Sequence, residues 1–253
     1  MKKIKEKTGT DEWSIETKNC ILGCSNDCVY CFGRGSAIRR GDKTSENWHE
    51  MKYRESSRKE IRKVKGVVMF PSTHDLFYEQ RDWWMPFLQG LLEKGNDMLI
   101  VSKPEFKAIE LICNSFEKYK DKIEFRFTIG SDTDLKRKFW EPNVSSIEMR
   151  IKVLEYAFKN GWRTSISMEP LLVYYPEKLI NRIYPYVTGE IWIGTMNRIP
   201  KEIKDNYASW YKEIKTIGGD ENIVRIYNVY KDNPKIKWKD SIRKKLTKLG
   251  YLT

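Results

Sequence analysis

The chain of 253 residues contains no apolar run that approaches the ~18 residues needed to cross a lipid bilayer. It also lacks low-complexity tracts and evident internal repeats, and its composition, 40% hydrophobic and 13% aromatic, is that of a globular protein. The first seven residues carry charge, but no apolar stretch follows them, so we expect no secretory signal. The sequence therefore predicts a cytoplasmic protein that does not bind a membrane.

Acidic residues are in deficit. The chain has 35 Asp and Glu against 47 Lys and Arg, which gives a net charge of +12 and a pI near 9.3. A basic excess of this size favours association with polyanions such as nucleic acid. Lysine is nevertheless spread over nearly every expected helix, as it is on solvated faces. Charge alone therefore favours a nucleic-acid partner without establishing one.

Cysteine is scarce and unevenly distributed. Only five occur, and four of them, Cys20, Cys24, Cys28 and Cys31, lie close together. An odd number in a chain with no expected export signal argues against a disulfide framework and favours metal or redox chemistry.

The last three of these cysteines have the spacing C-x3-C-x2-C, in a turn-prone segment after a strand-like run. We call residues 24–31 the cysteine loop. Iron–sulfur clusters are bound by cysteine sulfur, so three thiolates can hold three irons of a cubane cluster. The remaining iron would be free to bind and activate a small molecule. An alternative is a tetrahedral zinc site formed by the three cysteines with His74.

Short apolar or β-branched runs recur along the chain, separated by intervals that leave room for a helix. Continuous apolar strands suit a parallel sheet covered on both faces. With Trp13–Thr17 as the first strand, the pattern predicts an α/β fold, a partial (β/α)6 TIM-type barrel. We expect one domain over residues 1–253, with a lead-in at 1–10 and a short C-terminal extension from about 220 to 253. The other strands are expected at 67–70, 98–101, 125–129, 165–168 and 191–194.

Capping signals mark the helices between these strands. Asp82 is a plausible N-cap, and Ser145-Ser146-Ile147-Glu148 reads as a capping box. Pro104 and Pro176 are expected to open two further helices.

Three other segments complete the expected architecture. Residues 36–50 are polar and basic without a clear period, which predicts an exposed crossover. A seventh strand is possible at Ile223–Asn228, before a basic helix around Ser241–Leu249.

Ligands of such barrels gather at the carboxyl ends of the strands. The cysteine loop follows the first expected strand, and a polar residue follows each of the others. Ser, Asp and Asn are also ordinary loop and cap residues, so each has a purely structural alternative. The strand-end candidates are Thr73, His74, Lys103, Ser131, Asp132, Glu169 and Asn197.

Six segments are informative together: Trp13-Ser14, the cysteine loop with Tyr30 before its third cysteine, Lys103, 125–131, 139–142 and 165–170. They resemble the radical S-adenosylmethionine superfamily, and within it the spore-photoproduct-lyase-like branch, often labelled DNA repair photolyase. The resemblance covers residues 9–200 and is most specific in the cysteine motif.

This resemblance implies that Cys24, Cys28 and Cys31 ligate a [4Fe–4S] cluster whose fourth iron chelates S-adenosylmethionine. It further implies that one electron, from a donor such as flavodoxin or ferredoxin, cleaves this cofactor. The resulting 5′-deoxyadenosyl radical would abstract a hydrogen atom from the substrate, while the protein supplies orientation and a shielded cavity.

The resemblance also implies cofactor contacts at the barrel mouth. Lys103 would pair with the methionyl carboxylate as a point charge. The other expected cofactor contacts lie in or beside the cysteine loop or at strand ends: Tyr30, Phe32, Thr73, Ser131, Asp132, Glu169 and Asn197.

Cys20 and His74 are the candidate catalytic residues. A thiol can donate a hydrogen atom to a substrate radical, as the lyase reaction requires, but Cys20 fits neither cluster spacing and free cysteine is commonly buried. His74 would contact substrate or cofactor at a strand exit, or else be a loop histidine with a backbone hydrogen bond.

We therefore expect a radical S-adenosylmethionine enzyme, a lyase or a nucleic-acid-modifying enzyme, that acts on nucleic acid or a nucleotide. Two alternatives stay open. One is a related enzyme that acts on a peptide or small molecule, and the other is a non-catalytic iron–sulfur or zinc module that binds nucleic acid. The sequence leaves the oligomeric state open.

Overall fold

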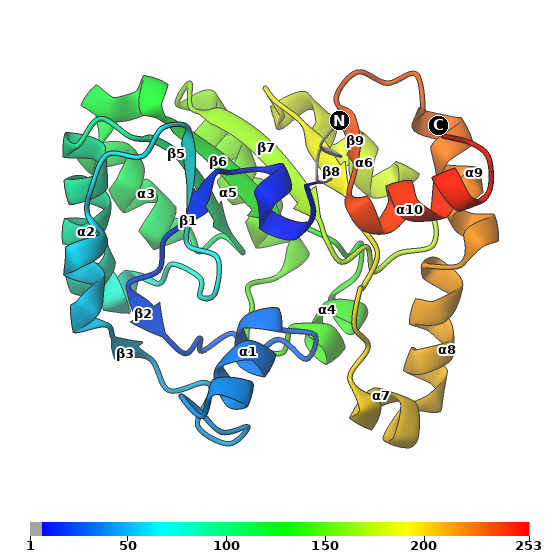
Figure 1. The fold of residues 1–253 in the computed structure, drawn as a ribbon. Coiled ribbons are helices and arrows are strands. Elements are labelled where there is room, and N and C mark those ends of the chain that lie inside the picture. Colours follow the sequence, from blue (N-terminus) through cyan, green and yellow to red (C-terminus); the bar gives the residue numbers. More distant parts are fainter. Residues whose placement is uncertain (1–6, 253) are drawn as a thin grey trace, which may run out of the picture.

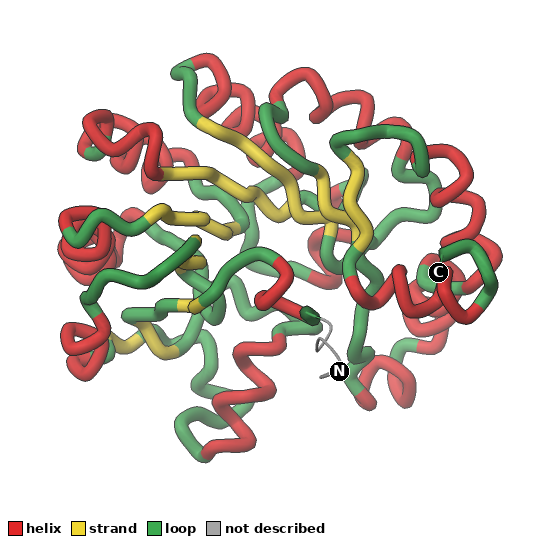
Figure 2. The backbone as a smooth tube through the Cα atoms, turned by 45° about the horizontal axis from the view of Figure 1, so that its top comes forward, coloured by secondary structure: helices red, strands yellow, loops and turns green. Residues whose placement is uncertain are grey.

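Seven parallel strands form one sheet in the order β1-β4-β5-β6-β7-β8-β9, within the residues 7–252 that the computed structural model describes. The sheet curls into a half-barrel with helices around its outside (Figures 1 and 2). The predicted α/β class and parallel partial barrel are confirmed. The strands are β1 Glu16–Thr17, β4 Val67–Phe70, β5 Asp97–Ser102, β6 Ile123–Thr128, β7 Arg163–Met168, β8 Ile191–Ile193 and β9 Ile236–Trp238.

The register of the sheet brings the strand exits to one edge. Phe70 pairs with Ile100, and Ile100 pairs with Phe125, all three fully buried. Because these strands are parallel and in step, the residues that follow β4, β5 and β6 emerge side by side. This edge is where the fold can assemble a site from distant parts of the chain.

Helices alternate with the strands of the sheet. The α-helices are α1 Phe32–Arg40, α2 Arg81–Glu93, α3 Phe106–Ser115, α4 Asp134–Trp140, α5 Ile147–Lys159, α6 Glu177–Ile183, α7 Lys201–Asn206, α8 Ala208–Ile217, α9 Asp220–Tyr230 and α10 Asp240–Lys248. Shorter elements are the antiparallel pair β2 Ile21–Leu22 and β3 Lys52–Tyr53, and the 3₁₀ helices η1 Gly9–Glu12, η2 Glu55–Glu60, η3 Tyr78–Gln80, η4 Glu117–Lys122 and η5 Tyr184–Tyr186. No helix in this described range is long and apolar enough to cross a membrane.

The expected seventh strand at Ile223–Asn228 is wrong. This segment lies in α9, where Ile223, Ile226 and Tyr230 recur at helical spacing and are buried on one face. The seventh strand is β9, which pairs with β8 in parallel.

The expected exposed crossover at 36–50 is wrong in part. Its first residues belong to α1, and the side chain of Trp48 is buried against Cys24 and Ala37. Two capping assignments also shift. Ser146, rather than Ser145, caps α5 by accepting a hydrogen bond from the Met149 amide, and Asp82 lies inside the first turn of α2.

The N-terminal turn and the last helix are joined inside the half-barrel by four residues, Glu12, Trp13, Lys239 and Arg243, which we call the terminal clasp. The fully buried Lys239 ammonium lies 2.6 Å from the Glu12 carboxylate and 4.0 Å from the centre of the Trp13 ring. Arg243 pairs with the same carboxylate. Residues 1–6 of the expected lead-in lie outside the described residues, while residues 9–12 form η1.

Candidate active site

Backbone contacts hold the cysteine loop. Gly23, at φ 95°, turns the chain into the loop, and a Cβ at this position would lie 2.2 Å from the Glu50 carbonyl oxygen. The Cys24 amide then donates to the Trp48 carbonyl at 3.1 Å, and the Val29 amide donates to the Trp140 carbonyl at 3.0 Å. The loop is therefore fixed at both ends of its sequence to segments far along the chain.

Asp75, which follows β4, links the loop to the exit of β5. Its Oδ2 accepts from the Asn26 amide at 2.8 Å and lies 3.9 Å from Cys24 Sγ. Its Oδ1 accepts from the Ser102 hydroxyl at 3.0 Å and the Lys103 backbone N–H at 2.8 Å. Burial alone would raise the pKa of the Asp75 carboxyl, but the charge of Lys103, together with these hydrogen bonds, holds it below its usual range. Asp75 is thus an anion at neutral pH.

The three thiols occupy a desolvated and crowded position. Burial raises the pKa of Cys24 to about 12, and the neighbouring Asp75 and Cys31 add to this shift. Burial also raises the pKa of Cys28, with Lys103 opposing it. Cys31 caps α1, and the Arg34 N–H donates to its sulfur at 3.3 Å.

This donor set suits an iron–sulfur cluster. Thiols so far from ionising become good ligands only beside a strongly positive centre, which metal ions supply. An N–H bond to a ligating sulfur is a feature of such sites. No three His, Cys, Asp or Glu side chains of residues 7–252 converge as ligands of one metal ion. Cysteines that bind different irons of a cluster need not converge on one point. A tetrahedral zinc site formed by the three cysteines with His74 would require such convergence.

Tyr30 is anchored by buried residues outside the cysteine loop. Its hydroxyl donates to Glu141, whose other carboxylate oxygen accepts from Arg150. Glu141 and Arg150 are both fully buried, and Arg150 also donates to the Thr128 carbonyl at the end of β6, at 3.2 Å. Burial and the Glu141 charge raise the pKa of Tyr30, so it remains a neutral donor.

Lys103 supplies positive charge to this group. Its Nζ lies 3.8 Å from Asp75 Oδ2 and 5.7 Å from the centre of the Tyr30 ring. Burial alone would lower the pKa of Lys103, but the neighbouring Cys28, Tyr30, Asp75 and Glu141 raise it well above its usual value. The ammonium is therefore charged at neutral pH.

Thr73 and Phe32 lie beside the loop. The Thr73 N–H donates to Asn19 Oδ1 at 2.9 Å, and a Cβ on Gly33 would lie 3.0 Å from the Thr73 carbonyl oxygen, so α1 packs closely on the exit of β4. Phe32 is 66% exposed, with the Arg198 guanidinium 6.0 Å from its ring centre.

The structure does not bring the other predicted contacts into this group. Glu169 pairs with Lys239 at 3.5 Å, and its pKa is raised to about 7, chiefly by burial. Asn197 is exposed at the exit of β8. Ser131 is buried and donates to the Thr133 carbonyl of its own turn at 2.9 Å, while Asp132 is exposed.

The two catalytic candidates are both buried. Cys20 lies in the main hydrophobic core, apart from Cys24, and burial raises its pKa to about 12. The His74 Nδ1 donates to the Asp75 carbonyl at 3.0 Å, and its ring packs edge-on against Phe70. Burial lowers the pKa of His74 to about 4. Both positions match the structural alternatives considered for these residues.

Sequence reasoning missed Asp75, Asn26, Glu141 and Arg150 as parts of the site. Asp75 follows the strand predicted at 67–70, next to the candidates Thr73 and His74, and this position was the signal that could have identified it. Glu141 stood in a segment that carried the family resemblance, but its buried pairing with Arg150 joins two helical segments and leaves no local pattern.

The fold is similar to that of spore photoproduct lyase. One solved structure, a double mutant with bound AdoMet and dinucleoside spore photoproduct, superposes with a TM-score of 0.54 at 14% identity over 85% of this chain. A tyrosine-to-phenylalanine mutant gives 0.55 at 14% identity over 86%. The chain spans 64% of the length of each of these proteins. No protein-family model matches the chain, and a search of curated proteins finds no match.

Proposed function

We propose that this protein is a radical S-adenosylmethionine enzyme that carries a [4Fe–4S] cluster and acts on nucleic acid or a nucleotide. One observation carries the proposal. A three-cysteine loop, anchored by a buried aspartate, lies at the carboxyl ends of the strands in a parallel half-barrel with the spore photoproduct lyase fold.

Cys24, Cys28 and Cys31 would hold the cluster, and the remaining iron would bind S-adenosylmethionine. When bound and reduced, by a donor such as flavodoxin or ferredoxin, the cluster supplies the electron that releases a 5′-deoxyadenosyl radical for hydrogen abstraction.

The residues of the chain position and shield these groups. The Arg34 N–H stabilises charge on the Cys31 sulfur, and Asp75 orients the first half of the loop through Asn26. Lys103 offers its ammonium to the carboxylate of the cofactor, with Asp75 holding its side chain at the loop. The Tyr30–Glu141–Arg150 chain fixes the loop from the protein interior.

Two features support a nucleic-acid or nucleotide substrate. The net charge of +12 favours polyanions. Two solved structures with the same fold contain a dinucleoside spore photoproduct. Cleavage of a pyrimidine photoproduct is the sharpest form of the proposal. It requires a hydrogen donor, which the buried positions of Cys20 and His74 do not supply.

Anaerobic reconstitution with iron and sulfide tests the proposal. We expect about four irons per chain and, with reductant and S-adenosylmethionine, production of 5′-deoxyadenosine. Cys28→Ala should lose iron and this activity. Cys113→Ala is the matched control, because Cys113 is a buried cysteine of α3 outside the loop. Purified protein that holds zinc and forms no 5′-deoxyadenosine would refute the enzyme proposal. Photodamaged DNA, RNA, nucleosides and peptides, offered separately, would then identify the substrate class.

A further inference from the structure

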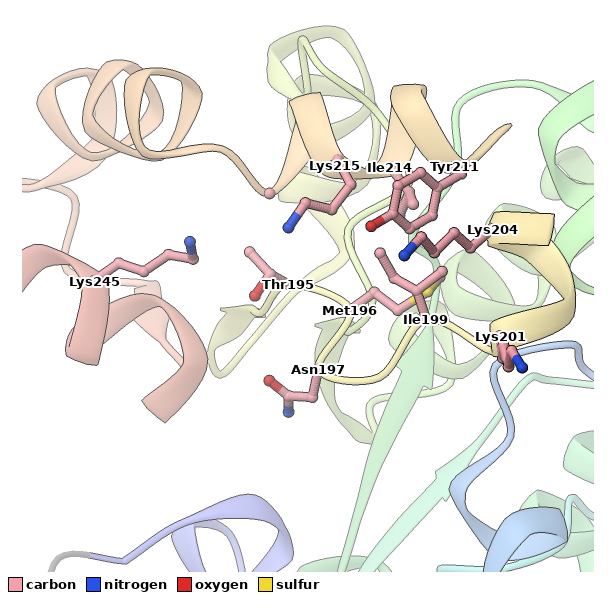
Figure 3. Close-up of a pocket in the computed structure, with 11 residues that line it drawn as sticks. Thr195, Met196, Asn197, Ile199, Lys201, Lys204, Tyr211, Ile214, Lys215 and Lys245 are labelled. Carbon is pink, nitrogen blue, oxygen red and sulfur yellow. The ribbon is translucent and has the colours of Figure 1, made fainter. Parts of the chain in front are cut away.

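A recess that includes no residue of the cysteine loop opens at the exit of β8. It has a volume of about 370 Å³ and is formed by the segment after β8 together with α7, α8 and α10. Four lysines line it, Lys201, Lys204, Lys215 and Lys245. Figure 3 shows the ammonium ends of Lys204, Lys215 and Lys245 around Thr195 and Met196.

Three of these lysines are not ion-paired within the part of the chain that the structure describes. Lys245 is paired with Asp220 at 3.0 Å. Lys201, Lys204 and Lys215 make no ion pair or side-chain hydrogen bond with any residue that the structure describes. The nearby Glu213 of α8 is taken by Lys136, at 2.9 Å. Like charges gathered at one recess repel each other, and a bound anion relieves this repulsion.

The rest of the lining suits phosphate. Thr195 and Tyr211 contribute hydroxyl groups, and Asn197 contributes an amide, all neutral groups that hydrogen-bond phosphate oxygens. Lysine binds phosphate as a point charge and does not require the fixed geometry of arginine.

The position of the recess favours a long polyanion. It follows β8 of the same parallel sheet whose β4 and β5 exits hold Asp75 and Lys103 beside the cysteine loop. The carboxyl ends of parallel strands lie on one edge, so a chain bound at the recess passes along the edge that carries the cysteines. Arg198, five residues after the end of β8, has its guanidinium 6.0 Å from the centre of the Phe32 ring at the start of α1, and so lies between the two regions.

We propose that this lysine pocket, defined by Lys201, Lys204 and Lys215, binds backbone phosphates of a nucleic-acid substrate and holds it across the active edge. The substrate class rests on the proposed function. The phosphate chemistry rests on the uncompensated charge of the pocket.

Binding of a labelled single-stranded oligonucleotide to the reconstituted protein, measured by fluorescence anisotropy at several salt concentrations, tests this proposal. Each phosphate contact contributes about 0.7 to the slope of log affinity against log salt for a single strand. The triple variant K201Q/K204Q/K215Q should lower that slope by about 2 and weaken binding roughly 10- to 100-fold at low salt. Replacing the same three lysines by arginine should restore binding, and circular dichroism confirms that each variant is folded.

The matched control is K65Q/K94Q/K152Q, which removes the same charge from three exposed lysines elsewhere on the fold. These lysines form no ion pair or side-chain hydrogen bond with any residue between 7 and 252. It should change affinity by no more than about twofold, since non-specific charge contributes little per residue at a distance. Equal slopes for the two triple variants would overturn the proposal. Calorimetric binding of inorganic phosphate that the pocket variant loses, with an unchanged oligonucleotide slope, would assign the pocket to a free phosphate ion and also overturn it.

No reductant is present in these measurements, so the outcome does not depend on turnover. If the protein forms 5′-deoxyadenosine but the salt slope does not depend on these lysines, the proposed enzyme function stands and the pocket proposal fails. If the slope depends on the lysines but no 5′-deoxyadenosine forms, the pocket proposal stands and the enzyme proposal fails.

Discussion

At the scale of single residues, Asp75 determines how the cysteine loop meets the sheet. Its two carboxylate oxygens satisfy donors from the loop and from the β5 exit, so one side chain couples segments that are far apart in the sequence. The three cysteines stood out because they lie close together in the chain, at a spacing that suits cluster ligands. Asp75 was not recognisable, because its partners stand 27 or more residues away and only the sheet brings them together.

Asp75→Asn should weaken both the fold and the cluster site. An amide has one acceptor oxygen, so at least one of the buried donors would lose its partner, at a cost of about 1–3 kcal/mol. Urea unfolding should show this loss, and iron content after reconstitution should fall. Asp97→Asn is the control, because Asp97 forms an exposed pair with Lys122 and should change stability by less than about 1 kcal/mol. Equal effects of the two variants would contradict the role given to Asp75.

His74 should make the protein sensitive to acid. Its pKa is about 4 in the folded protein, against 6.5 for the free side chain. Between these values the unfolded chain binds a proton that the folded chain does not. Stability is therefore full above pH 6.5 and is lost as the pH falls towards 4, by at most about 3 kcal/mol.

His74→Gln should flatten the melting temperature profile between pH 6.5 and 4. His49→Gln, at an exposed side chain, is the matched control and should leave the profile as in the unaltered protein. A profile for the His74 variant that falls as steeply as before would show that burial of His74 is not the cause. Retention of 5′-deoxyadenosine formation by this variant would favour a structural role over a catalytic one.

At the scale of elements, strands and helices could be predicted from the sequence where apolar residues form a recognisable run or stripe. β4, β5, β6, β7 and β8 were all found because each contains a short run rich in apolar or β-branched residues, and most of their residues are buried. β9, Ile236–Trp238, was missed because Lys237 at its centre interrupts the apolar run, whereas β8, equally short, reads Ile-Trp-Ile. α1 was missed because its buried residues are Gly33 and Ala37, whose small side chains leave no apolar stripe.

Gly23 is the turn residue between β2 and the cysteine loop. Gly23→Ala should destabilise the loop, because alanine at φ 95° is strained by about 1–2 kcal/mol and its Cβ would clash with the Glu50 carbonyl. We expect less iron after reconstitution and a lower melting temperature. Gly35→Ala in α1 is the matched control. Its Cβ would meet only the Arg39 side chain, at 3.5 Å, and alanine favours helix. An unchanged iron content of Gly23→Ala after reconstitution would show that the cysteine loop does not require glycine at this position.

At the scale of the whole molecule, the terminal clasp compensates for the open form of the barrel. The two edge strands β1 and β9 do not pair with each other among the described residues. The buried side chains of Glu12 and Lys239, with the partly exposed Arg243, join their neighbouring segments instead. No sequence pattern indicated this contact, because it joins two charged residues more than two hundred positions apart.

Lys239→Met should be strongly destabilising. It removes one of the two counter-charges of the buried Glu12 carboxylate and leaves Arg243 as the other, and breaking one partner of a buried pair costs about 3–5 kcal/mol. Thermal and urea unfolding measure this loss, and the double variant Glu12→Gln with Lys239→Met should recover part of it. Lys159→Met, which removes an exposed pair with Glu155, should cost no more than about 1 kcal/mol. A similar small cost at Lys239 would contradict the importance of the clasp.

The clasp also brings the first described residues close to the last helix. Arg243 contacts the carbonyl of Lys7 at 3.5 Å, and α10 ends at Lys248, about 8 Å further along the helix axis at 1.5 Å per residue. A short peptide linker between residues 252 and 7 would therefore close the described part of the chain into a ring with little loss of loop entropy. The exposed turn at Asn160-Gly161, between α5 and β7, then offers a place to cut that ring. The fold thus permits circular permutation, with new termini at the amino ends of the strands and away from the cysteine loop.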